Sequence, residues 1–238
     1  MQEKDLYRMI NGNDGTLVSS SFSALMRKVY VWMTLALVIT GVTAYGVANS
    51  PALLTAIFSS RALMWGLIIG ELALVFVISG MINRLSLTTA TLLFVLYSVL
   101  NGATLSVIFV VFSTSAIAKT FFITAGMFGA MSLYGYTTKQ DLSSIGKILF
   151  MALIGIIIAT IVNVFMKSSM VDTVISYIGV VVFTGLTAWD TQKIKNALAT
   201  AEGMDEGVQK IALIGALNLY LDFINLFLYL LRIFGDRR

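Results

Sequence analysis

Three acidic side chains stand inside long apolar runs of the sequence, where an ionised group is costly: Glu71, Asp190 and Asp222. A charged side chain at the centre of a membrane-spanning helix costs at least about 2.5–3.5 kcal/mol on insertion scales. Such residues usually face the interior of a helix bundle, where they bind protons, ions or one another. They are the strongest functional candidates in a chain that contains neither histidine nor cysteine.

Asp222 belongs to a polar stripe in the last apolar run. The stripe has five members at the spacing of one helical face: Gly215, Asn218, Asp222, Asn225 and Tyr229. Leucine, isoleucine, phenylalanine and alanine occupy the other faces of this run. We therefore expect the stripe to face protein or an internal cavity rather than lipid.

Asp190 ends the preceding apolar run and is either an interfacial residue or a partner of Asp222. The two runs are consecutive and hence antiparallel, and Gly203 and Gly207 in their polar connection predict a turn near residue 205. Residues equidistant from the turn of a helical hairpin meet at the same height, so the sequence predicts that Asp190 and Asp222 are neighbours.

Two carboxylates that touch in a low dielectric cannot both ionise cheaply, and they titrate as one coupled unit. Such a pair could sense pH, or it could contact Ca²⁺, which takes oxygen ligands. The structural alternative is a permanently hydrogen-bonded pair with no role in transport. Because histidine is absent, a pH response near neutrality would have to come from carboxylates.

Glu71 lies in the middle of the second apolar run and needs either a cation or a hydrogen-bonding partner. Arg84, after the end of that run, and Arg232, near the end of the seventh, are the available cations. Arg84 could instead reach the aspartate pair as a latch from the cytoplasmic side, or serve as a positive anchor at the membrane surface.

Seven apolar runs of the sequence would hold these acidic residues in place. A helix that crosses a bilayer needs about 20 apolar residues, and each run is long enough. They cover residues 29–49, 62–82, 87–112, 117–136, 145–166, 171–190 and 211–234. The chain is 58% hydrophobic and 12% charged, whereas soluble domains are about 25% charged. We therefore expect an all-α integral membrane domain over residues 28–235, preceded by a polar segment, 1–27. Gly66 and Gly70 have the spacing of close helix–helix contacts.

Most lysines and arginines flank the runs on one side if the N-terminus is cytoplasmic, whereas the three C-terminal arginines fall on the other side unless the last run fails to cross. The basic residues lie between apolar runs and form no patch for nucleic acid. We find no phosphate-binding loop and no nucleophile–base set, and so we expect neither an enzyme nor a cofactor.

Several segments resemble motifs of the Bax inhibitor-1 family. The two most specific are FTGLTAWDTQKIK at residues 183–195, around Asp190, and LYLDFINLFLYLLR at residues 219–232, around Asp222. Gly70-Glu71, YSVLNG at 97–102 and YGYTTKQDL at 134–142 add support. The resemblance extends over roughly residues 20–235.

The resemblance implies seven helices with the last one central and six around it, and a pH-sensitive calcium leak across the membrane. It implies that Asp190 and Asp222 form a di-aspartyl pH sensor, with Glu71 and Arg232 as supporting charges. The family's second-helix arginine has only an approximate counterpart, since Arg84 lies two residues beyond the matching position. The short loops and tails are typical of a bacterial member.

The leading hypothesis is a pH-sensitive calcium leak channel in a bacterial inner membrane, with a cytoplasmic N-terminus and Ca²⁺ as the transported ion. Its partners would be the lipid bilayer, Ca²⁺ and protons. The first alternative is a proton-coupled cation exchanger. The second is a non-conducting regulator that binds another membrane protein.

Overall fold

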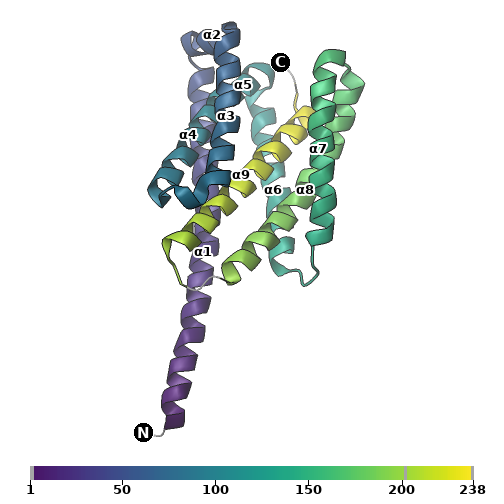
Figure 1. The fold of residues 1–238 in the computed structure, drawn as a ribbon. Coiled ribbons are helices and arrows are strands. Elements are labelled where there is room, and N and C mark those ends of the chain that lie inside the picture. Colours follow the sequence, from purple (N-terminus) through teal and green to yellow (C-terminus); the bar gives the residue numbers. More distant parts are fainter. Residues whose placement is uncertain (1–2, 201–202, 237–238) are drawn as a thin grey trace.

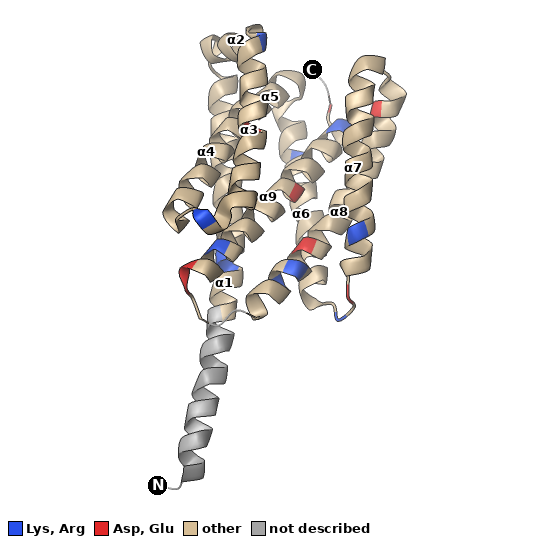
Figure 2. Cartoon of the chain, in the orientation of Figure 1, with Lys and Arg blue, Asp and Glu red and all other residues tan. Residues whose placement is uncertain are grey.

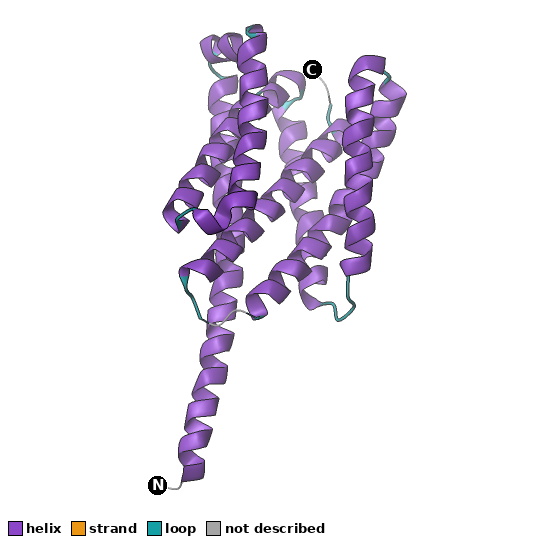
Figure 3. Cartoon of the chain, viewed as in Figure 1, coloured by secondary structure: helices purple, strands orange, loops and turns teal. Residues whose placement is uncertain are grey.

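The computed structural model describes the backbone of residues 3–200 and 203–236, and side chains from residue 22 onward within these ranges. The secondary-structure elements of this part of the chain are all helices, joined by short loops, and it contains no strand (Figure 3). Its elements are α1 (Glu3–Ala48), α2 (Pro51–Ser59), α3 (Arg61–Met81), η1 (Ile82–Arg84), α4 (Leu87–Leu105), α5 (Val107–Val111), α6 (Thr114–Thr137), α7 (Ser143–Met166), α8 (Ser169–Ala199) and α9 (Glu206–Phe234). Most side chains of the expected polar segment 1–27 lie outside the described residues.

Among the described residues, seven helical stretches are long and apolar enough to cross a membrane, which confirms the expected fold class. They are Phe22–Ala48, Arg61–Arg84, Leu87–Val111, Thr114–Thr137, Ser143–Met166, Ser169–Ala199 and Glu206–Phe234. The last two extend beyond the predicted runs toward the loop that joins them, so the hairpin of α8 and α9 is longer than a bilayer requires.

Short polar side chains start most of these helices at the ends of the apolar runs. Each side-chain oxygen accepts a hydrogen bond from a backbone N–H in the first helical turn, which is otherwise unpaired. The capping residues are Ser50, Ser60, Ser86, Ser113, Ser168 and Asp205. The helix boundaries therefore follow from where serine and aspartate interrupt the apolar sequence.

Helix α9 forms the centre of the bundle and crosses it obliquely from one end to the other (Figure 1). In its most apolar stretch 67% of the residues are buried, against 6% in α3 and in α7. It packs directly on α1, α4, α6 and α8, while α3 packs on α4 and α7 packs on α8 as outer helices. We call the end of the bundle with the α8–α9 loop the N-terminal end, and the opposite end, where α9 finishes, the C-terminal end (Figure 1).

Candidate ion site between α8 and α9

Asp190 of α8 and Asp222 of α9 lie within hydrogen-bonding reach of each other. Asp222 is 5% exposed, and its Oδ2 atom has no hydrogen-bond partner among the described residues. Because ionised carboxylates carry no donor, a hydrogen bond between the two side chains requires a proton held by one of them. The adjacency predicted from the hairpin is present, although Asp190 lies closer to the connecting loop along its helix than Asp222 does.

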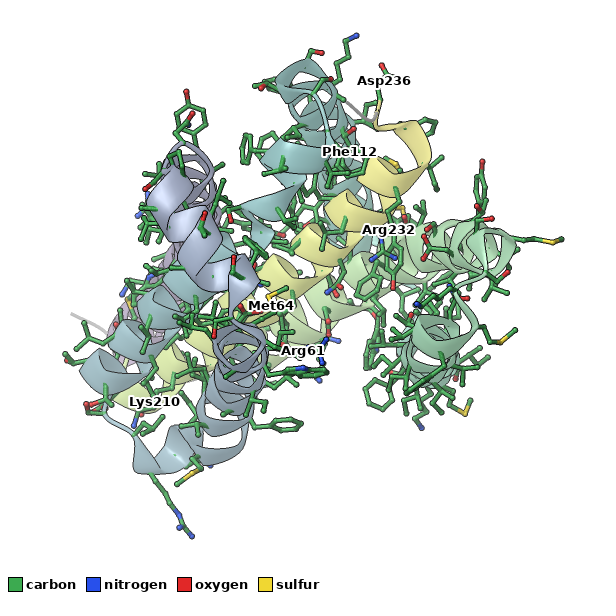
Figure 4. The ribbon with its side chains drawn as sticks, turned by 90° about the horizontal axis from the view of Figure 1, so that it is seen from above. Arg61, Met64, Phe112, Lys210, Arg232 and Asp236 are labelled. Atoms are coloured by element: carbon green, nitrogen blue, oxygen red, sulfur yellow. The ribbon has the colours of Figure 1, made fainter. Side chains whose placement is uncertain are left out.

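A cavity of about 590 Å³ opens beside this pair, with walls from α3, α4, α7, α8 and α9. Most of its lining is apolar. Its polar lining consists of Glu71, Tyr97, Asp190, Lys193, Asn218, Asp222, Asn225 and Tyr229. Viewed along the bundle, α9 runs obliquely through its middle, from Lys210 near the start of the helix to Arg232 near its end (Figure 4). The cavity therefore brings three acidic groups together in the spanning part of the protein.

The polar stripe of α9 faces inward, as expected. Asn218, Asp222, Asn225 and Tyr229 all line the cavity. Gly215 packs instead against α8, where a Cβ atom would lie 3.0 Å from the side chain of Ile194. None of these positions is left to face lipid.

Glu71 is held by hydrogen bonds rather than by a cation. Asn101 Nδ2 donates to its Oε2 atom at 3.2 Å, and the Thr104 hydroxyl donates to Oε1. The network continues inward, because the Tyr220 hydroxyl donates to Asn101 Oδ1 at 3.0 Å and lies 2.7 Å from Thr40 Oγ1. Of the two kinds of partner considered for Glu71, the structure contains the hydrogen-bonding one.

Arg84 does not reach the aspartate pair. Helix α3 ends at Met81, and Arg84 lies beyond it, exposed at the end of η1 and outside the cavity lining. The ion pairs in the described part of the chain are Lys210–Glu206 and Arg232–Asp172, so an arginine–aspartate latch is not formed here.

The cation whose charge influences Asp190 is Lys193. From the sequence we counted this lysine only among the basic residues that flank the apolar runs. Its ammonium lies 5.2 Å from the centre of the Trp189 ring, and its side chain lines the cavity. The i, i+3 spacing from Asp190 puts both on neighbouring positions of one helical face, which could have revealed it.

Arg232 lies at the C-terminal end of the bundle, away from Glu71. Its Nη1 atom is 3.4 Å from Asp172 Oδ1, and its guanidinium lies 5.6 Å from the centre of the Tyr229 ring. Asp172, in the first turn of α8, was not predicted as a site residue. Its partner Arg232 lies 60 residues further along the chain, so no local sequence pattern points to Asp172.

Calcium would find only part of a coordination shell at the aspartate pair. The described residues contain no group of three or more acidic, histidine or cysteine side chains placed to hold a metal ion. Calcium takes six to eight oxygen ligands, so the pair would need water or the amide oxygens of Asn218 and Asn225, which line the same cavity.

The fold and site together define a multi-pass membrane protein with an acidic pair inside its helix bundle. A family model described as "Inhibitor of apoptosis-promoting Bax1" matches residues 23–238, and the chain therefore belongs to the Bax inhibitor-1 family. It is 56% identical over 214 residues to the inner membrane protein YbhL of Escherichia coli K12, a match that covers 90% of this chain and 92% of that protein.

Two further relatives are uncharacterised proteins. One, from Borreliella burgdorferi, is 46% identical over 222 residues, covering 93% of this chain and 94% of the relative. The other, RP147 of Rickettsia prowazekii, is 46% identical over 215 residues, covering 90% and 89%. The family resemblance seen in the sequence motifs is thus confirmed over nearly the whole chain.

Proposed function

We propose that this protein is a pH-sensitive leak channel for Ca²⁺, in which Asp190 and Asp222 sense protons and contact the ion. The single observation that carries the proposal is the buried contact between these two carboxyl groups at the wall of a cavity that also holds Glu71, with Asp222 Oδ2 left without a partner among the described residues. A permanent structural pair would be expected to have its oxygens satisfied by donors.

The pair has two states that differ by one proton. With the proton, the carboxyl groups are joined by a hydrogen bond and the α8–α9 contact is closed. Without it, two negative charges repel each other or accept a cation between them. The other charged groups that face this site are Lys193, on the next turn of α8, and Glu71, across the cavity. Calcium flux should therefore rise as the pH rises.

We place the protein in a bacterial inner membrane with the N-terminus in the cytoplasm. The E. coli relative is named as an inner membrane protein. Lysine and arginine segments gather toward the N-terminal end of the bundle (Figure 2), the pattern typical of cytoplasmic loops. Arg232 is at the opposite end, where Asp172 offsets its charge.

The test is calcium flux into liposomes across a pH series, comparing wild type with Asp190→Asn and Asp222→Asn. Asparagine keeps the size and hydrogen-bonding capacity of aspartate but cannot titrate, so both variants should lose the pH dependence. Asp141→Asn is the matched control, because this loop acid is exposed and hydrogen bonds from Ser143 lower its pKa. Unchanged pH profiles in both site variants would refute the sensor assignment.

A proton-coupled cation exchanger is the second candidate, and the contact between the Asp190 and Asp222 carboxyl groups beside the cavity favours it as well. The proton and the cation would compete for the same two carboxylates, which is the requirement for exchange. An internal pH indicator in the same liposomes separates the two: an exchanger moves protons outward in fixed ratio to calcium, whereas a channel does not. Absence of flux at every pH, with a membrane protein that copurifies, would favour the non-conducting regulator.

A further inference from the structure

We propose that the ring of Tyr229 is the barrier between the carboxylate cavity and the C-terminal end of the bundle, and that the Asp172–Arg232 ion pair holds this ring in place. The role of this barrier in conduction rests on the proposed channel function. Its position does not, and can be tested separately.

Polar residues recur along the contact between α8 and α9 from the aspartate pair to the C-terminal end. On α9 they are Asp222, Asn225, Tyr229 and Arg232, and on α8 they are Asp190, Ser176 and Asp172, with the apolar Gly179 between Asp190 and Ser176. A cation that leaves the Asp190–Asp222 pair along this contact would meet the next carboxylate only at Asp172. Tyr229 lies between these two acidic positions.

Tyr229 is seated on a glycine of α8. A Cβ atom at Gly179 would lie 2.6 Å from the Tyr229 ring, so only glycine leaves room for it. The ring of Phe183 closes the next position, with the two ring centres 5.8 Å apart. Because the seat is an aromatic ring against helix backbone, water and hydrated ions are excluded there, as in other apolar constrictions that gate pores.

A second hollow lies on the other side of this ring. It has a volume of about 400 Å³ and is lined by Asp172, Ser176 and Arg232 among others. Arg232 links the hollow to the ring, since its guanidinium lies 5.6 Å from the ring centre and 3.4 Å from Asp172. Displacing the ring would join this hollow to the carboxylate cavity without breaking a backbone hydrogen bond of either helix.

The lack of native cysteine allows a direct test of the barrier. Asn225→Cys places a thiol in the cavity, and a membrane-impermeant methanethiosulfonate reagent is applied in spheroplasts, to the periplasmic side, and in inverted membrane vesicles, to the cytoplasmic side. Thr173→Cys, in the exposed outer hollow, reports which preparation presents the C-terminal end. The measured quantity is the labelling rate of Asn225→Cys from that side.

We expect Tyr229→Ala to raise this rate by about tenfold, the factor for a barrier lowered by about 1.4 kcal/mol. Tyr229→Phe keeps the ring and should leave the rate unchanged. Tyr45→Ala removes a tyrosine ring that packs on Phe109, away from this contact, and controls for loss of aromatic packing. Gly179→Ala should also raise the rate, because its methyl group displaces the ring without deleting it.

The outcomes separate this inference from the channel proposal. Faster labelling in Tyr229→Ala and Gly179→Ala supports the barrier even if liposomes show no calcium flux, in which case the channel proposal alone fails. Labelling that stays slow in both folded variants overturns the barrier, whatever Asp190→Asn and Asp222→Asn do to the pH profile. A rate that rises equally in Tyr45→Ala also overturns it.

Discussion

Helices α8 and α9 are in contact at two pairs of ionisable side chains, which differ in the signs of their charges and in their burial. Asp190 and Asp222 are two acids in contact, and one of them is almost fully buried. Asp172 and Arg232 are an acid and a base 3.4 Å apart, with side chains 44% and 40% exposed. Under the proposed function the first pair depends on a proton, whereas the second depends on a counter-charge, so we expect this helix contact to respond to pH and to salt at different places.

The packing around α8 also differs between the two ends of this contact. Near Asp190, Gly135 of α6 approaches the backbone of Ala188, and Gly146 of α7 lies under the Trp189 ring. Toward the Asp172 end, the close contact of α8 is between Gly179 and a side-chain ring, Tyr229, and a side chain can yield where helix backbone cannot. We infer that the acid pair sits in a fixed frame and that movement of α8 against α9 is easiest at the C-terminal end.

Gly135→Val should have the largest effect, because it would break the fixed frame. A Cβ atom at this position would overlap the Ala188 carbonyl, and helix backbone cannot yield as a side chain can. We expect a loss of about 3 kcal/mol of unfolding free energy, the upper part of the range for overpacked cores, measured by thermal unfolding in detergent. Gly129→Val, on the same helix, has open space around its Cβ position among the described residues and should be near neutral.

The pH dependence of stability should come next and would sharpen the comparison. If the folded pair keeps a proton that separated aspartates would have released, the folded state binds more protons than the unfolded state, and stability falls as pH rises. The slope is at most about 1.4 kcal/mol per pH unit for one proton. Melting of wild type and Asp222→Asn across pH 5–8 tests this, and parallel curves would show that no proton is shared.

Tyr220→Phe should cost less, about 1–2 kcal/mol, the range for leaving a buried partner unsatisfied. Its hydroxyl is buried and joins Thr40 of α1 to Asn101 of α4, which in turn holds Glu71. The variant therefore tests whether the position of Glu71, the third acidic residue of the cavity, depends on this hydrogen-bond network. Tyr177→Phe, an exposed position on α8, is the control, and equal melting of both variants would argue against the network.

The sequence was sufficient for the helices and for the acid pair, for reasons that are local. Apolar runs of spanning length define the helices, and the 3.6-residue period placed Asn218, Asp222 and Asn225 on one face. A hairpin also brings the facing sides of its two helices together, so Asp190 could be matched to Asp222, although the two lie at different distances from the loop rather than at the equal distances predicted. Each of these inferences needs only one helix or two consecutive ones.

Partners that come from helices distant in sequence could not be predicted. Asn101 as the partner of Glu71 depends on how α3 packs on α4, and Asp172 as the partner of Arg232 depends on where α8 begins beside the end of α9. The glycine spacing also misled, since Gly66 has open space around it among the described residues, whereas Gly135 makes a close approach. Spacing shows which residues could pack closely, and only the fold selects among them.

Asp172→Asn should have the smallest effect on stability, which is the clearest contrast with the buried pair. Exposed ion pairs contribute about 0–1 kcal/mol because water and salt screen them and ordering long side chains costs entropy. We expect the melting temperature to fall slightly at low ionic strength and to match wild type at about 1 M salt, where the screening length is about 3 Å. Asp222→Asn should differ from wild type about equally at both salt concentrations, because Asp222 is nearly fully buried and buried groups are screened much less than exposed ones. A large, salt-independent loss of stability in Asp172→Asn would mean that the C-terminal end of the α8–α9 contact is as rigid as the packing around Asp190.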